Sequence, residues 1–310
     1  MSTKIEWTDK TWNPIVGCSK VSPACDHCYA EKMAFRLAHN PKAPIEYRNV
    51  VTDAGTWNGK TALVESTLGT PLHWRKPCRV FVGSMTDLFH EDTPDEWIGK
   101  VFATMALSSH ITFQVLTKRP ERMHRFINGI HNTIGVVDPR QPDGPNDPVL
   151  VQHVKWPLPN VWLGVTVENQ EQADKRIPIL LDTPAAVRFV SVEPMLGPVD
   201  LEGVGRDLNA LEGVWAVKSP GENNEYDIFD TPALDWVICG GETGPGARPM
   251  WEPWARDLME QCEADGIPFF FKKWGAYRGP DDWKIPAGDK IGGRIIREFP
   301  EENGGSGDES

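Results

Sequence analysis

Long apolar segments are missing from this chain of 310 residues. No run approaches the roughly 18 apolar residues of a membrane-spanning helix, and the polar start Met1-Ser2-Thr3-Lys4 lacks the apolar centre of a signal peptide. An excess of positive charge is missing too, since the net charge is -12. This argues against general binding to a phosphate backbone, which depends on cations, but leaves room for a local basic region. We therefore expect a cytoplasmic protein without membrane contact.

Cysteine is scarce, with six residues, yet half of it is concentrated in one place. Cys18, Cys25 and Cys28 lie on one short segment just before an expected helix, and the other three cysteines are scattered singly. Three thiols on so short a loop cannot pair off, and the cytoplasm keeps thiols reduced. A bound metal therefore explains the three cysteines better than disulfides do.

The identity of the metal depends on the fourth ligand. Structural zinc takes four protein ligands, and the nearby candidate, His27, lies between Cys25 and Cys28, where it cannot easily turn toward the same ion. A four-iron cluster with three cysteine ligands instead leaves one iron open for an outside group. The sequence favours a 4Fe-4S cluster on Cys18, Cys25 and Cys28, with zinc as the alternative.

Five short runs carry a resemblance to a known family. They are Lys4-Ile5-Glu6-Trp7-Thr8, Thr11-Trp12-Asn13-Pro14, Gly17-Cys18 with Cys25-Asp26-His27-Cys28-Tyr29-Ala30, Ser191-Val192-Glu193-Pro194 and Cys239-Gly240-Gly241-Glu242. Over about residues 3–275 the chain resembles a phage and prophage family of uncharacterised three-cysteine, radical-SAM-like proteins. Its cysteine segment resembles a variant of the radical S-adenosylmethionine signature, with six residues rather than three in the first gap and His27 in place of an aromatic residue.

The resemblance implies two cofactors, the 4Fe-4S cluster and S-adenosylmethionine. In enzymes of this kind the open iron binds the amino and carboxylate groups of S-adenosylmethionine, and an electron from the cluster releases a 5'-deoxyadenosyl radical. An electron donor protein is then an expected partner. We therefore interpret the chain as a radical-SAM-type enzyme of unknown substrate, with nucleic-acid modification or repair favoured.

Two other functions stay open at this point. One is a zinc-binding, non-enzymatic module for nucleic-acid or protein interaction. The other is a barrel that binds the cofactor without cleaving it. The sequence indicates nothing about the oligomeric state.

Seven apolar segments alternate with amphipathic helices and predict an α/β fold with a parallel sheet. The strands are expected within residues 4–16, 79–83, 111–116, 161–166, 187–192, 234–238 and 267–271. This number of repeats favours a full or partial (β/α) barrel of the radical-SAM type, and an open doubly wound sheet is the alternative. We expect one domain over residues 1–296, with loop insertions at about 40–77, 131–160 and 197–232, followed by a disordered acidic tail at 297–310.

Polar residues directly after the strands are the candidate site, because reactive groups of α/β barrels lie at the carboxyl ends of the strands. We assign cofactor binding to Ser84, Asp87, Thr166, Glu168, Asn169, Ser191, Glu193, Gly240, Gly241 and Glu242. Ser84 and Asp87 are expected to bind the amino group of the cofactor. The two glycines are expected to permit close backbone approach to the adenine or the substrate.

One further cysteine and four basic residues complete the predicted site. Cys239, at the end of the sixth strand, is the candidate catalytic donor of a hydrogen atom, and simple core packing is its alternative interpretation. The basic residues are Lys118, Arg119, Lys272 and Lys273. If these four basic residues face the same rim of the barrel, they favour an anionic small molecule, a nucleotide or a nucleic-acid end as substrate.

Overall fold

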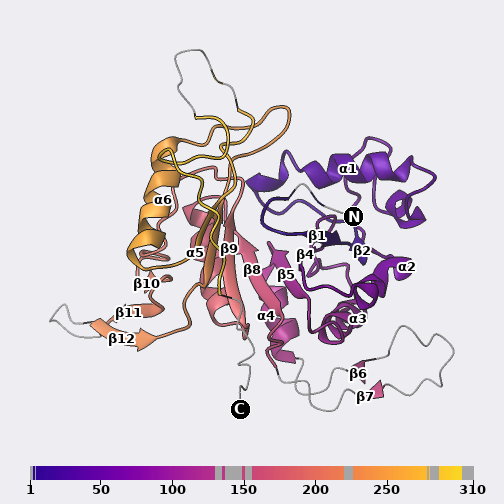
Figure 1. Cartoon of the computed structure of the whole chain (residues 1–310), viewed down its shortest axis with the longest axis horizontal. Helices are drawn as coiled ribbons and strands as arrows, with labels where there is room; N and C mark the ends of the chain where they lie inside the picture. The colour runs from indigo at the N-terminus through magenta and orange to yellow at the C-terminus, as the bar shows by residue number, and fades with distance from the viewer. Residues whose placement is uncertain are drawn as a thin grey trace.

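A seven-stranded parallel sheet forms the centre of the protein in this computed structural model (Figure 1). Its strands are β1 (Lys10–Trp12), β4 (Arg79–Val82), β5 (Thr112–Thr117), β8 (Val161–Thr166), β9 (Val187–Val192), β13 (Trp236–Cys239) and β14 (Phe269–Phe271). The structure describes residue 3 and residues 5–129, 135–136, 149–150, 156–219, 226–277, 279 and 286–301. All seven predicted strand regions contain a strand of this sheet.

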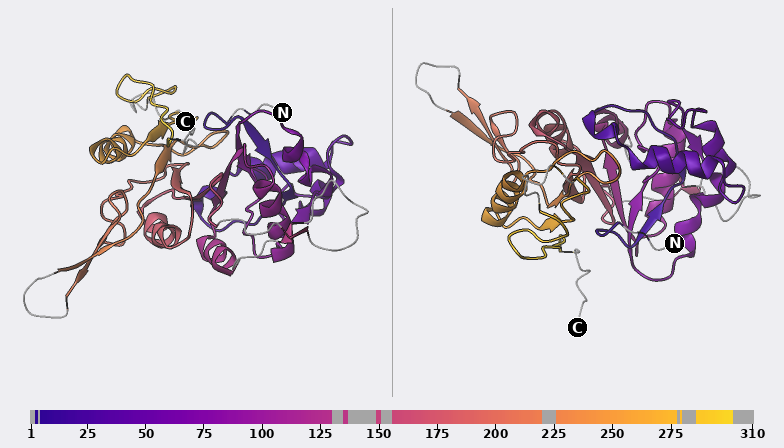
Figure 2. Two further views of the ribbon diagram at one scale, coloured as in Figure 1. Left: turned by 60° about the horizontal axis from the view of Figure 1, so that its bottom comes forward. Right: turned by 90° about the horizontal axis from the view of Figure 1, so that it is seen from above.

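The strands lie side by side in the order in which the chain visits them, and every pairing is parallel. A doubly wound sheet would reverse its strand order at a switch point. No reversal occurs here, and the sheet curls into a half-barrel (Figures 1 and 2). The prediction of a partial barrel is confirmed, and the open doubly wound alternative is wrong.

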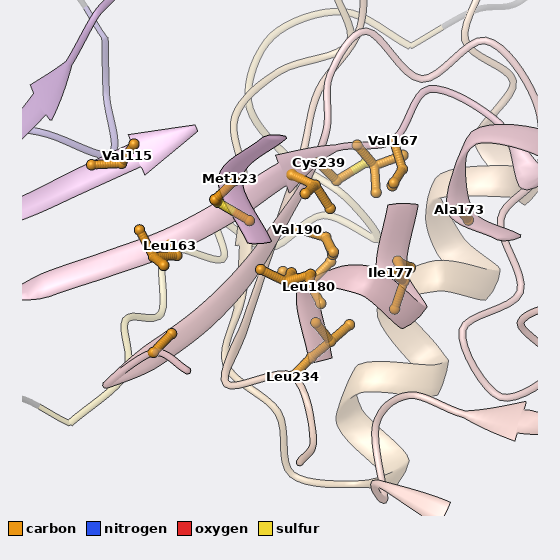
Figure 3. Close-up of a cluster of buried hydrophobic side chains, with 14 of the residues drawn as sticks. Val115, Met123, Leu163, Val167, Ala173, Ile177, Leu180, Val190, Leu234 and Cys239 are labelled. Atoms are coloured by element: carbon orange, nitrogen blue, oxygen red, sulfur yellow. The ribbon is translucent and has the colours of Figure 1, made fainter. Parts of the chain in front are cut away.

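In the described part of the chain, five helices of ten residues or more lie between strands of the sheet, as parallel pairing favours, and only the connection from β9 to β13 contains no helix. They are α1 (Tyr29–Ala38), α3 (Asp95–Ala106), α4 (Pro120–Gly129), α5 (Gln170–Leu181) and α6 (Glu252–Ala264). Apolar side chains at helical spacing face the strands. On α5, for example, Ala173, Ile177 and Leu180 pack toward Val190 of β9 (Figure 3). This packing forms the larger hydrophobic core.

The other face of the sheet carries a second, aromatic core. Alternate strand residues point to it, since side chains alternate along a strand. Its fully or nearly buried members are Trp7, Phe81, Trp162, Val187, Phe189, Trp236, Ile238 and Phe270. Gly164 is required here, because a Cβ atom on it would lie 2.6 Å from the ring of Phe189.

The predicted insertions differ in how much regular structure they contain. Residues 40–77 hold short elements: η2 (Ile45–Asn49), β3 (Ala62–Leu63), which pairs with β2 (Ile15–Val16), α2 (Glu65–Leu68) and η3 (Thr70–His73). Most of 131–160 lies outside the described residues, apart from the paired strands β6 (Gly135–Val136) and β7 (Val149–Leu150) and residues 156–160. The insertion at 197–232 was expected to be a loop, but it forms a three-stranded antiparallel sheet of β10 (Leu208–Asn209), β11 (Val214–Lys218) and β12 (Tyr226–Asp230).

The predicted tail begins later than residue 297. Phe299 packs on Trp236 and Phe270, with both ring centroids 5.3 Å away, and the guanidinium of Arg79 lies 3.7 Å above the Phe299 ring. These contacts place Phe299 in the second core, so the packed chain extends at least that far. Residues 302–310 of the predicted tail lie outside the described residues. No helix in the described part is long and apolar enough to cross a membrane.

Candidate functional site

A pocket of about 230 Å³ lies at the carboxyl-terminal edge of the half-barrel. It brings together most of the predicted site residues, namely Cys18, Cys25, Cys28, Ser84, Asp87, Lys118, Arg119, Thr166, Ser191, Glu193, Gly241, Glu242 and Lys272. Five predicted residues are not among those that line it: Glu168, Asn169, Cys239, Gly240 and Lys273. The loops after the strands thus share one rim, as parallel strands of a barrel require.

The cysteine loop, residues 17–28, forms one wall of this pocket. It contains the short turn η1 (Pro23–Cys25) and ends at Cys28, which directly precedes α1. Its three cysteines are free thiols. Burial and the nearby charge of Asp87 raise the pKa of Cys18, Arg119 opposes them, and the pKa lies at about 11. This thiol is protonated at neutral pH, so binding a metal as thiolate releases a proton.

The donor set of the loop, three thiols on the wall of one pocket, fits the number of protein ligands of a cluster that keeps one iron open. Three sulfurs on one zinc would lie about 3.8 Å apart, because each Zn–S bond in the tetrahedron is about 2.3 Å long. Sulfurs that bind separate irons of a cluster lie farther apart. Across the described ranges, no three histidine, cysteine, aspartate or glutamate side chains are grouped to hold one metal ion. The three thiols all line the wall of one pocket.

Asp87 is fully occupied by the protein itself. Its Oδ1 accepts hydrogen bonds from the Phe89 amide at 3.1 Å and the Thr117 hydroxyl at 2.6 Å. Its Oδ2 accepts from the Lys118 amide at 2.9 Å and from Arg119 Nη1 at 3.0 Å. A carboxylate offers about four acceptor positions. Asp87 lines the pocket, but an amino group of the cofactor would have to compete with these four donors, so its predicted cofactor contact stays a prediction.

Arg119 holds the first half of the cysteine loop. Its Nη2 donates to the carbonyl and hydroxyl oxygens of Ser19, at 3.3 and 2.8 Å, and its Nη1 lies 3.9 Å from the sulfur of Cys18. Its Nε donates to Glu91 at 2.9 Å. With its charge paired to Asp87 and Glu91 and its side chain 5% exposed, Arg119 is a positioning residue. It is not the free substrate-binding cation that we expected.

Glu242 holds the second half of the loop together with Arg248. The Glu242 carboxylate accepts from His27 Nδ1 at 3.0 Å and from the amide and guanidinium of Arg248. Arg248 also donates to the Pro23 carbonyl at 2.9 Å and lies 3.6 Å from Asp26. Burial raises the pKa of Glu242, but hydrogen bonds from Arg248 and His27 outweigh it, so the pKa lies below its ordinary value. These contacts give Glu242 a structural role at the pocket wall, and its predicted contact with the cofactor stays a prediction.

A third ion pair supports the middle of the loop. Glu168 is fully buried, accepts from Arg176 Nη1 at 3.0 Å and also accepts from the Ala24 amide at 3.4 Å. Asn169 caps α5 by accepting from the Gln172 amide at 3.1 Å. Neither residue lines the pocket, so their predicted contact with the cofactor is replaced by structural roles.

The start of the loop depends on a glycine. Gly17 has φ of +99°, and a Cβ atom on it would lie 2.2 Å from the Lys60 carbonyl oxygen. Its own carbonyl accepts from the Thr86 hydroxyl at 2.6 Å. Only glycine satisfies both the left-handed backbone and the close approach.

Three hydroxyl groups of the pocket remain able to bind a ligand. Thr166 and Ser191 line the pocket, and their hydroxyls have no hydrogen-bond partner among the described residues. The Ser84 hydroxyl donates to Asn13 at 3.1 Å but can still accept. The cofactor-binding roles that the sequence assigned to these groups stay predictions.

The predicted lysines differ in their availability. Lys272 lines the pocket but pairs with Glu193 at 2.5 Å. Lys273 does not line it and lies 3.8 Å from Glu6. Lys118 lines the pocket, and its ammonium group makes no ion pair with any residue in the described ranges. Lys118 is therefore the predicted cation that remains able to bind an anion.

The glycines at 240 and 241 serve the backbone rather than a ligand. A Cβ atom on Gly241 would lie 2.3 Å from the Trp274 carbonyl oxygen, and one on Gly240 would lie 3.3 Å from the Lys272 side chain. The close approach is therefore to the segment after β14. The expectation of close approach to adenine or substrate is not supported by this geometry.

Cys239 lies in the core and not in the pocket (Figure 3). Its neighbour on β13, Ile238, points into the aromatic core, so Cys239 points to the opposite face, toward the helices. The side chain is fully buried, its sulfur lies 3.9 Å from that of Met195, and burial raises its pKa. Core packing, the alternative interpretation, replaces the predicted hydrogen-atom donor.

Sequence reasoning missed three residues that hold the loop: His27, Arg176 and Arg248. Arg176 had a signal, because it lies at helical spacing among the buried Ala173, Ile177 and Leu180 of α5. Arg248 follows a glycine- and proline-rich stretch that predicts only a turn. Its partners lie far away in the chain and become visible only in the folded structure.

Fold and site together define an α/β half-barrel protein with a three-thiol loop beside a pocket of mixed polar and apolar lining. The chain belongs to the family described as "Protein of unknown function (DUF5131)", which it matches over residues 2–300. The match covers the cysteine loop and every strand of the half-barrel. No curated protein and no solved structure matches the chain.

Proposed function

We propose that this protein is a radical-SAM-type enzyme that carries a 4Fe-4S cluster on Cys18, Cys25 and Cys28. One observation carries the proposal: three free thiols of one loop line a pocket at the carboxyl edge of a parallel half-barrel. The radical-SAM type of the barrel and a phage or prophage origin of the family belong to the same proposal.

The three thiols would act as ligands of three irons and leave the fourth iron open toward the pocket. When bound, the cluster would supply one electron to S-adenosylmethionine and so generate a 5'-deoxyadenosyl radical. The protein contributes the position of the thiols. The ion pairs of Arg119, Glu168 and Glu242 hold the loop from three strand ends.

The free hydroxyls fit the polar parts of S-adenosylmethionine. Thr166 and Ser191 follow neighbouring strands and are able to bond to ribose hydroxyls, and Ser84 is able to accept from an ammonium group. Glu193 shares one oxygen with Lys272 and keeps the other for the same ammonium group. We retain these four residues as the cofactor contacts.

Lys118 supports an anionic substrate, such as a nucleotide or a nucleic-acid end. Its unpaired charge lies on the pocket wall of a protein with a net charge of -12, where it is a local exception. We propose nucleic-acid modification or repair in the cytoplasm as the favoured reaction class. An electron donor protein would complete the reaction.

Anoxic reconstitution with iron and sulfide, followed by dithionite and S-adenosylmethionine, tests this proposal. We expect about four irons per chain and formation of 5'-deoxyadenosine, measured by chromatography. Alanine at Cys18, Cys25 or Cys28 should abolish both. Cys78→Ala is the matched control, because this cysteine is also partly exposed but does not line the pocket.

Three other results of the reconstitution experiment would each lead to a different conclusion. A colourless protein that holds zinc in place of iron contradicts the proposal and favours the closed zinc module. Iron without 5'-deoxyadenosine shows a protein that binds the cofactor without cleaving it. Equal iron content in the pocket variants and the wild type would place the metal elsewhere.

A further inference from the structure

An antiparallel arm projects from the half-barrel on the side of α5 and α6 (Figures 1 and 2). We define the arm as the paired strands β11 and β12. Every residue of β12 is exposed, and Tyr226, Ile228 and Phe229 remain 54%, 60% and 56% exposed. On β11, Trp215 and Val217 are also exposed. Large apolar side chains on both faces of a narrow ribbon are unusual for a surface that stays in water.

The arm has an open edge. β12 is the last strand in the sheet order β10-β11-β12, so one side of its backbone has no partner strand among the residues that the structure describes. The Thr231 amide donates to the Gly213 carbonyl, and alternation along an antiparallel pair then turns Asp227 and Phe229 toward β11. The N–H and C=O groups of Tyr226, Ile228 and Asp230 consequently point outward.

The open edge of β12 can pair with the same edge of a second copy of the chain. When two copies of β12 pair antiparallel about a two-fold axis at Ile228, Ile228 meets Ile228 and Tyr226 meets Asp230. Each of these pairs exchanges two backbone hydrogen bonds. Asp227 then lies opposite Phe229, so no two carboxylates face each other. Sliding one copy of β12 by two residues in one direction would place Asp227 opposite Asp227 of the second copy. A slide in either direction also leaves fewer residues paired.

We propose that this protein forms a two-fold dimer through β12, with a continuous sheet running across both copies. The charge pattern and the outward backbone groups select one register, and the arm projects away from the half-barrel (Figure 2). Like-charged bodies, at -12 each, oppose the association. A pairing of five residues is also smaller than the roughly 1,200 Å² of a standard interface. The dimer is therefore weak and is strengthened by salt.

Sedimentation of the full chain over a range of concentrations, at low and moderate salt, tests the dimer. Ile228→Pro removes an outward N–H and leaves the β11–β12 hydrogen bonds intact, so it should raise the dimer dissociation constant at least tenfold. Ile228→Val keeps the N–H and the branched shape and should change the constant less than twofold. Ile228→Lys, which sets two cations opposite each other, should weaken the dimer without removing a backbone donor. Thermal unfolding verifies that all variants fold.

Two results overturn the proposal. A wild-type chain that stays monomeric at every concentration and salt level would show that the edge does not pair with itself. Dimerisation of Ile228→Pro and Ile228→Lys with the wild-type constant would place the interface on another surface. Loss of the dimer in both variants, with retention in Ile228→Val, supports pairing through this edge.

Discussion

The interior of the half-barrel has two ends with opposite character. Toward the start of the strands, Trp162, Trp236 and Phe270 form a closed aromatic layer, which Phe299 covers. Toward their carboxyl ends, the same face carries hydroxyls and charged groups around an open pocket. On β9 the change takes two residues, from buried Phe189 to the pocket residue Ser191. One sheet thus carries a packed aromatic core at one end of its strands and an open pocket at the other.

The largest expected effect comes from the aromatic end. Trp236→Ala should lower the free energy of unfolding by about 3–5 kcal/mol, because it opens a cavity among five aromatic rings. Denaturant titration measures the loss. Trp215→Ala, at the exposed arm, is the matched control and should change stability by less than about 0.5 kcal/mol. Equal losses in both variants would contradict the distinction between core and surface tryptophans.

The ion pairs at the pocket end should have a smaller, pH-dependent effect. Glu242→Gln should cost about 1–3 kcal/mol at neutral pH, because Arg248 and His27 lose a charged acceptor. The pKa of Glu242 is lowered in the folded protein, so its stabilisation is present above the ordinary glutamate value of 4.5 and disappears as pH falls through the lowered value. The gap between wild type and variant should therefore close on acidification. A gap that stays constant from pH 7 to pH 3 would contradict this assignment.

Replacement of Cys239 tests whether this residue at the end of β13 belongs to the core or to the pocket. Cys239→Ala should cost about 1 kcal/mol of stability, as expected for a small buried side chain. Because the thiol faces the helices, formation of 5'-deoxyadenosine should stay at the wild-type rate. If Cys239→Ala has normal stability but no longer forms 5'-deoxyadenosine, Cys239 would regain its predicted role as hydrogen-atom donor.

The smallest stability change is expected at Lys118. Lys118→Ala should alter the free energy of unfolding by less than about 0.5 kcal/mol, because the ammonium group has no partner in the described parts of the chain. It should weaken binding of a nucleoside 5'-monophosphate about tenfold, or ~1.4 kcal/mol, measured by calorimetry. Lys118→Arg keeps the charge and should retain most of the affinity. Unchanged affinity in Lys118→Ala would remove this residue from the site.

Strand positions and the shared rim could be predicted from the sequence because they depend on local patterns. Runs such as residues 161–166 and 187–192 are apolar over the length of one strand and end at polar residues. Parallel strands then bring those ends to one edge. The same logic found the cysteine loop, Thr166 and Ser191.

The roles of the charged residues could not be predicted, because they depend on partners distant in the chain. The sequence predicted that Asp87 and Glu242 accept hydrogen bonds, and they do so. Their donors in the structure, however, are Arg119 and Arg248 and not a ligand. Likewise, Cys239 lies one residue past an inward-facing neighbour, and only the pleat of β13 decides which face it takes. A sequence shows which groups are polar, whereas the fold decides which of them stay free.

The electron paramagnetic resonance spectrum of the reconstituted, dithionite-reduced protein, recorded before and after addition of S-adenosylmethionine, tests the central claim most directly. We predict the signal of one reduced four-iron cluster, which changes when the added molecule binds the open iron and is lost in Cys28→Ala. A wild-type protein without this signal, or a signal that is the same in Cys28→Ala, would contradict the assignment of the three thiols.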